Sequence, residues 1–127
     1  MIKVQLSGDF EFKEKDLKKR NYELSIITDC YATITINDEL FFEDWICPLE
    51  LYFQYLDWKE DFNNGLIRDF EYISDDNGEN PILSFNKIND KWFAYSVLTQ
   101  KRSDFLTINE VLDFFESFEV QLLKHKI

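Results

Sequence analysis

Hydrophobic and polar residues alternate along several segments of the chain, a pattern typical of half-buried β-strands. In the first segment Ile2, Val4 and Leu6 alternate with polar residues, and Phe10 and Phe12 are expected to continue the strand after a bend. The other alternating segments are rich in β-branched and aromatic residues. The pattern predicts strands over residues 2–6, 22–28, 31–36, 69–74, 81–87 and 91–98, with a charged connection over 13–20 and a short apolar piece over 40–42.

Helical spacing replaces alternation in two segments. Pro48 opens the first, since proline is favoured in the first turn of a helix, and Asn63-Asn64-Gly65 ends it. The second segment begins with Thr107 and Glu110, which have the spacing of a capping box. We therefore predict helices over about 48–62 and about 107–124.

The helix predicted over 48–62 carries two apolar stripes, although one stripe is enough to dock a helix on a sheet. The first stripe contains Leu49, Tyr52, Phe53 and Leu56, and the second contains Leu51, Tyr55, Trp58 and Phe62. Two stripes indicate either that the helix is buried on two sides or that one apolar face is left for a partner.

The order of elements is strands, helix, strands and helix, with short turns between consecutive strands. Short turns favour antiparallel pairing. The sequence thus predicts a single α+β domain over residues 1–127, with a mainly antiparallel sheet of about five to six strands and the two helices packed on it.

Composition narrows the class further. The chain has 127 residues, of which 45% are hydrophobic and 17% aromatic, and this excludes intrinsic disorder. It has neither an apolar run long enough to cross a membrane nor an N-terminal segment that resembles a signal peptide. Two cysteines, Cys30 and Cys47, are too few for a disulfide framework and are expected to be small buried hydrophobes. We expect a cytoplasmic protein.

Acidic residues are concentrated in the middle of the chain. The sequence has 25 acidic and 14 basic residues, a net charge of −11. Residues 37–80 hold 13 of the acidic residues but only two basic ones, Lys59 and Arg68, whereas the segments on either side are neutral overall. This charge argues against binding to nucleic acid or an anionic membrane through a basic surface. The acidic stretch is either a solvated face that aids solubility or a docking surface for a basic partner.

Side chains with catalytic or metal-binding potential are sparse. The single histidine, His125, is expected to be solvated, and no histidine lies near Cys30 or Cys47 to complete a zinc site. Residues 75–79 have Asp, Asn and Glu at alternate positions but lack the spacing of an EF-hand, and their Asn-Gly pair predicts a hairpin turn. We predict no metal and no cofactor, and an enzyme that uses a carboxylate pair is the least supported class.

Three segments together resemble the small acidic immunity proteins of bacterial contact-dependent growth inhibition and polymorphic-toxin systems. They are the helix that starts Pro48-Leu49-Glu50-Leu51, the strand Pro81-Ile82-Leu83-Ser84-Phe85, and Lys91-Trp92-Phe93-Ala94-Tyr95-Ser96 followed by the last helix. The resemblance implies a cytoplasmic protein that binds and blocks one cognate toxin, often a nuclease. It implies no functional residue.

The charge map and the doubled stripe suggest where such a partner would bind. Carboxylates attract a basic partner, and large aromatic residues can anchor it. The predicted partner-binding residues are Asp38, Glu39, Glu43, Asp44, Trp45, Tyr55, Asp57, Trp58, Glu60, Asp61, Asp75, Asp76 and Glu79. The alternative is a non-catalytic adaptor domain that binds a basic endogenous protein, and the aromatic content also permits a homodimer.

Overall fold

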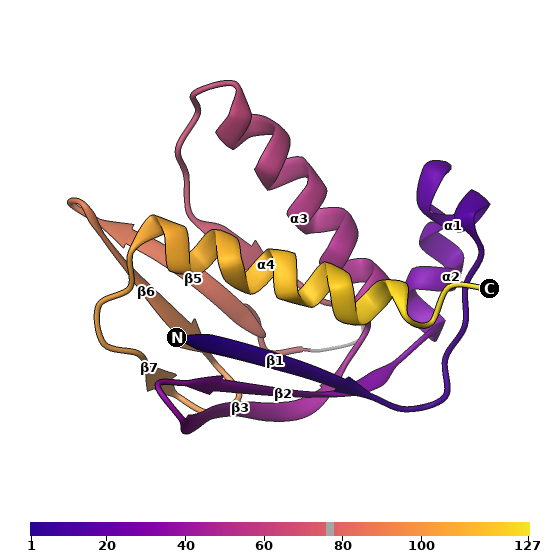
Figure 1. The fold of residues 1–127 in the computed structure, drawn as a ribbon, viewed down its shortest axis with the longest axis horizontal. Coiled ribbons are helices and arrows are strands. Elements are labelled where there is room, and N and C mark those ends of the chain that lie inside the picture. The colour runs from indigo at the N-terminus through magenta and orange to yellow at the C-terminus, as the bar shows by residue number, and fades with distance from the viewer. Residues whose placement is uncertain (76–77) are drawn as a thin grey trace.

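A computed structural model describes residues 1–75 and 78–127, and within them the chain forms seven strands and four helices (Figure 1). In chain order these are β1 (Ile2–Ser7), α1 (Glu14–Lys18), α2 (Tyr22–Ile27), β2 (Cys30–Ile36), β3 (Glu39–Ile46), α3 (Pro48–Asn63), β4 (Phe70–Tyr72), β5 (Leu83–Ile88), β6 (Lys91–Ser96), β7 (Lys101–Arg102) and α4 (Ile108–Leu123).

The strands form two antiparallel sheets, one in the order β1-β2-β3 and one in the order β4-β5-β6-β7. In the first sheet Ile34 pairs with Phe42 and Thr35 pairs with Leu40, so Phe41 is the extra residue of a β-bulge. A bulge breaks the alternation of faces along a strand. Consequently the consecutive side chains of Phe41 and Phe42 are both buried.

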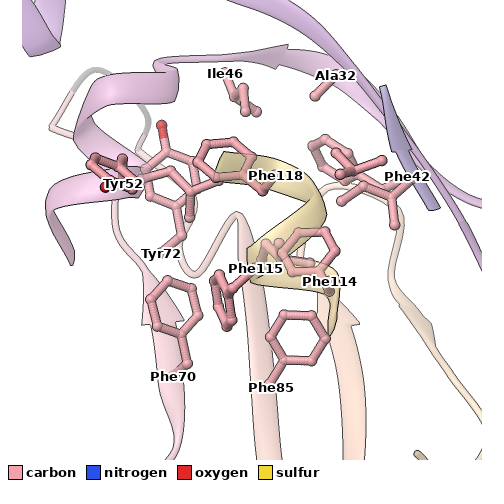
Figure 2. Packing of buried hydrophobic residues seen from close by; sticks show 14 of the residues in the cluster. Ala32, Phe42, Ile46, Tyr52, Phe70, Tyr72, Phe85, Phe114, Phe115 and Phe118 are labelled. Atoms are coloured by element: carbon pink, nitrogen blue, oxygen red, sulfur yellow. The ribbon is translucent and has the colours of Figure 1, made fainter. Parts of the chain in front are cut away.

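Helix α4 supplies the aromatic core that joins the two sheets. Figure 2 shows its Phe114, Phe115 and Phe118 lying among residues of both sheets. The ring centroid of Phe115 is 4.9 Å from that of Phe70 in β4 and 5.6 Å from that of Phe85 in β5. The predicted capping box begins this helix, because the Thr107 hydroxyl accepts from the Glu110 N–H at 3.2 Å. A helix that packs on both sheets makes them one folding unit.

Helix α3 is buried on two sides. On one side Phe53 meets Tyr22 of α2 edge to face, with ring centroids 5.5 Å apart. On the other side Tyr55 stacks on Phe115 of α4 at 4.3 Å, and Trp58 is 1% exposed. The indole N–H of Trp58 donates to the Arg68 carbonyl at 2.7 Å. Both apolar stripes are therefore used inside the molecule, and neither is left for a partner.

The α+β class and the two long helices are confirmed, and several details differ. Residues 22–28 were expected to be a strand, but the Asn21 side chain accepts from the Leu24 N–H and caps helix α2. The charged connection over 13–20 contains helix α1, and the apolar piece over 40–42 lies within the longer strand β3. The strands form two sheets where one was expected.

The C-terminal residues lie along the segment that precedes α1. Phe10 and Phe12 do not continue β1, and Phe12 instead pairs in parallel with Lys126. His125 was expected to be solvated, but its ring stacks on Phe10 with centroids 3.9 Å apart and its Nδ1 lies 3.1 Å from the Phe10 carbonyl oxygen. His125 therefore fastens the C-terminal segment to the start of the chain. Cys30 and Cys47 are buried, as expected.

Candidate functional site

The predicted partner-binding residues do not form one surface. Asp38 and Glu39 lie at the β2–β3 turn, while Asp44 and Trp45 lie near the other end of β3, about 20 Å of strand away. A third group lies on α3, and Asp75 and Glu79 lie in the connection between β4 and β5. Asp76 is outside the described residues.

The group on α3 is the least suited to bind a partner. Asp57 pairs with Arg20, and an oxygen of Asp61 lies 3.0 Å from the Arg68 guanidinium. These pairs compensate part of the negative charge of the helix. Trp58 belongs to the core and is withdrawn as an anchor, because its ring has no exposed face to offer. Tyr55 is half-buried, and its ring is already stacked on Phe115.

Several carboxylates lie with the exposed rings of Tyr22 and Trp45 around two hollows formed by α2, the end of β3, the start of α3 and residues 74–75. We call this surface the acidic end, and it contains Tyr22, Glu23, Ile26, Ile27, Asp29, Glu43, Asp44, Trp45, Glu50 and Asp75. Trp45 is 57% exposed and meets Tyr31 edge to face at 5.5 Å. A hydrogen bond to Glu43 raises the pKa of the Tyr31 hydroxyl above its ordinary value. Trp45 is thus an exposed ring held in place beside carboxylates.

Two adjacent hollows mark the acidic end. The first has a volume of about 290 Å³ and lies between α2 and α3, lined by Tyr22, Glu23, Ser25, Ile26, Glu50, Gln54 and Asp75. The second has a volume of about 170 Å³ and is lined by Asp29, Trp45, Ile46, Cys47, Tyr72, Ser74 and Ile82. They meet where the Cys47 thiol approaches the Ile26 carbonyl oxygen at 3.8 Å. Among the described residues that line the two hollows there is no lysine or arginine.

Glu50 is the buried carboxylate of the first hollow, with 7% of its surface exposed. The Tyr72 hydroxyl donates to its Oε1 at 3.0 Å, and the Asp75 N–H donates to its Oε2 at 3.4 Å. Tyr72 also accepts from the Cys47 N–H at 3.1 Å, so it links the two hollows. Desolvation, with the negative charge of Glu50, raises the pKa of Tyr72 and keeps its hydroxyl protonated as a donor.

Sequence reasoning missed six of the ten residues of the acidic end. Tyr22, Glu23, Ile26 and Ile27 were overlooked because residues 22–28 were interpreted as a strand, and Asp29 because it lies outside the acidic stretch 37–80. Glu50 carried a detectable signal, since it is a carboxylate among the apolar residues at the start of α3. Such a position either faces solvent or is held by buried donors, and the structure shows the second arrangement.

Other parts of the described surface are less suited to bind a basic partner. A groove of about 440 Å³ separates the start of β3 from β7, but Lys101 and Arg102 line it together with Glu39 and Asp104, so its charge is mixed. Within residues 1–75 and 78–127 no three His, Cys, Asp or Glu side chains are grouped to hold a metal ion. In the same residues no helix is long and apolar enough to cross a membrane.

Comparison with known proteins places the chain in a family. The family described as Domain of unknown function (DUF7878) matches residues 2–127, and the chain belongs to it. No curated protein matches the chain, and no solved structure matches it.

Proposed function

We propose that the protein is an immunity protein that binds a cognate toxin domain with a basic surface and neutralises it by occupying that surface. The observation that carries this proposal is the acidic end, where the exposed ring of Trp45 lines one of two hollows whose described lining includes four carboxylates and no lysine or arginine. A solvated face that served only solubility would not need an exposed tryptophan.

Electrostatics explains why such a surface suits a nuclease toxin. A nuclease binds a polyanion, so its cleft is expected to be basic. Carboxylates on the inhibitor attract that cleft before contact and raise the association rate constant to about 10⁸ M⁻¹s⁻¹ or above. In the complex they would take the places of phosphates and pair with lysine and arginine side chains. Trp45 would then slow dissociation by burying its ring.

The arrangement of the acidic end supports binding rather than catalysis. Its buried carboxylate, Glu50, is held by two donors, and the Ser25 hydroxyl that lines the same hollow donates to the Tyr22 carbonyl. His125 is not among the described residues that line the two hollows, and its ring is stacked on Phe10. The proposal accordingly describes stoichiometric inhibition, without cofactor or metal, in the cytoplasm of the cell that makes the toxin.

Capture followed by an activity assay tests the proposal. The tagged full chain is used to capture partners from lysate of its native cells, at low and at high salt, and the captured protein is then produced alone. We expect a basic protein that cleaves nucleic acid and loses that activity when one equivalent of the chain is added. A captured partner that is harmless when expressed without the chain would contradict the immunity function and favour the adaptor alternative. Recovery of the chain alone would contradict both.

A further inference from the structure

The hollow between α2 and α3 has the features of a seat for one cationic side chain. We propose that it receives the ammonium group of a lysine from the basic partner, with Glu50 at its base and the exposed apolar residues of the acidic end as the docking surface around it. This inference rests on the proposed function and adds to it the chemistry of the central contact.

The docking surface combines apolar and acidic groups. On α2, Tyr22 is 60% exposed and Ile27 is 75% exposed, and Trp45 is exposed at the second hollow. Glu23 and Asp75 line the first hollow together with Tyr22 and Ile26. A lysine matches this arrangement because its aliphatic stem packs on apolar side chains while its ammonium group pairs with carboxylates. The occupant is therefore a segment of a basic protein.

The charge of Glu50 lacks a counter-ion. Across residues 1–75 and 78–127, the ion pairs within 4.0 Å involve Glu14, Asp38, Asp57, Asp61 and Glu110, and none involves Glu50. Arg20, which contacts the Tyr22 hydroxyl at the acidic end, is paired with Asp57. Hydrogen bonds and its position in the first turn of α3 reduce the cost of burying this carboxylate, and an opposite charge beside it would stabilise it further. A cation from outside would supply it.

The hydrogen bonds that Glu50 already accepts favour lysine over arginine as the occupant of the hollow. Each oxygen of Glu50 already accepts one hydrogen bond, from Tyr72 and from the Asp75 N–H. The planar guanidinium group of arginine binds best to a carboxylate whose two oxygens are both free. An ammonium group has three donors on one atom and can divide them among several carboxylates. Glu50, Glu23 and Asp75 provide such a set in one hollow.

The polar side chain of Gln54, which also lines the hollow, is already hydrogen-bonded. The Gln54 amide donates to the Ile73 carbonyl at 2.7 Å and accepts from the Ile73 N–H at 2.9 Å, so both of its polar atoms are occupied. With a volume of about 290 Å³, the hollow is at the lower limit of the roughly 300–1,000 Å³ that small-molecule sites occupy. It is suited to one side chain rather than to a metabolite.

A peptide titration tests the inference directly. Tetralysine, tetraarginine and tetralysine acetylated on its side chains are titrated into the isotope-labelled full chain, and amide shifts are recorded by NMR at low salt. We expect tetralysine to shift the amides around Glu50, Gln54 and Asp75 and to bind more tightly than tetraarginine. Acetylated tetralysine is expected to produce no such shifts. Equal or tighter binding of tetraarginine would overturn the assignment of lysine.

Comparison of Glu50→Gln with the matched control Glu60→Gln distinguishes lysine binding at the proposed seat from attraction by the overall negative charge. Both variants remove one negative charge, but Glu60 is exposed on α3 away from the hollow. We expect Glu50→Gln to weaken tetralysine binding about tenfold and Glu60→Gln to leave it almost unchanged. Glutamine keeps an acceptor for Tyr72 but turns its NH2 group toward the Asp75 N–H, so melting temperatures serve only to confirm that both variants fold. An equal effect of the two variants on tetralysine binding would overturn the proposed seat.

Failure of the seat and failure of the immunity function give different results. If a toxin is captured and inhibited but Glu50→Gln binds it as well as Glu60→Gln does, the lysine seat is wrong and the immunity function stands. If tetralysine binds at Glu50 but the captured protein is not a toxin, the seat stands and the immunity function is wrong.

Discussion

Trp45 is the single side chain on which binding should depend most. Its ring is 57% exposed and contacts Tyr31, so Trp45→Ala should lower the free energy of unfolding by only about 1 kcal/mol. Loss of an anchor at the centre of an interface costs about 2 kcal/mol or more, which is roughly 30-fold in the dissociation constant. Calorimetry with the captured partner measures the second quantity, and urea unfolding measures the first.

Two controls make the Trp45 result interpretable. Val120→Ala removes an exposed apolar side chain from α4 that lines neither hollow of the acidic end, and should leave binding unchanged. Trp58→Ala should instead lower the free energy of unfolding by about 3–5 kcal/mol, since that ring is fully buried. Unchanged binding in Trp45→Ala would remove this residue from the interface.

Cys30 makes stability sensitive to alkali. Burial raises the pKa of its thiol to about 12, compared with about 8.5 in an unfolded chain. Between these values the folded state holds a proton that the unfolded state releases, so the free energy of unfolding falls as the pH rises from about 9 toward 12. Urea unfolding at a series of pH values should show this decrease, and Cys30→Ala should show a shallower one. Parallel pH profiles for the two proteins would contradict the shift.

At the level of secondary-structure elements, the C-terminal segment is held by contacts that the sequence did not reveal. His125→Ala removes a ring stacked on Phe10 and a hydrogen bond to its carbonyl. We expect a loss of about 1–2 kcal/mol in the free energy of unfolding, together with faster hydrogen exchange at the Ile127 amide, which donates to the Phe12 carbonyl. Lys124→Ala, an exposed neighbour, is the control. Unchanged exchange at Ile127 would show that the stacked ring does not hold the segment.

The elements that could be predicted are those whose capping or proline residues mark the same boundaries as their pattern of buried side chains. Pro48 and the Thr107–Glu110 capping box marked the starts of α3 and α4, and both helices begin there. Residues 22–28 were misread because alternating apolar residues suggested a strand, whereas the Asn21 cap and the packing of Tyr22 on Phe53 stabilise a helix. The split into two sheets depends on contacts of α4 with distant strands, which no local pattern encodes.

For the candidate site, too, some features could be predicted from the sequence and others depend on the fold. The excess of acidic residues in the middle of the chain and the choice of Trp45 came from the sequence alone. Which of the acidic residues share a surface depends on the fold, since Asp38 and Asp75 are at separate places and α2 contributes residues from outside the acidic stretch. The two-striped helix predicted a free apolar face as one alternative, and packing against both α2 and α4 removed it.

For the whole molecule, the net charge of −11 should govern how fast a basic partner is bound. Salt screens attraction between separated charges but affects packed contacts less. Raising the ionic strength from 0.05 to 0.5 M should therefore lower the association rate constant about tenfold or more and change the dissociation rate constant much less. Stopped-flow kinetics with the captured partner measures both. A salt-independent association rate constant would contradict electrostatic steering.

The central claim is that the acidic end, and not the acidity of the whole molecule, binds the partner. Two triple variants with the same net charge test it: Glu23→Lys, Asp29→Lys and Asp75→Lys at the acidic end, and Glu60→Lys, Asp113→Lys and Glu116→Lys on the exposed sides of α3 and α4. All six carboxylates are exposed, so both variants are expected to fold.

The measurement is the dissociation constant of each triple variant for the captured partner at physiological salt. If the acidic end is the interface, its variant should bind at least a hundredfold more weakly than the natural chain. The variant on α3 and α4 should then lose less than tenfold through weaker long-range attraction. Equal losses in the two variants, or a greater loss in the α3 and α4 variant, would contradict the claim.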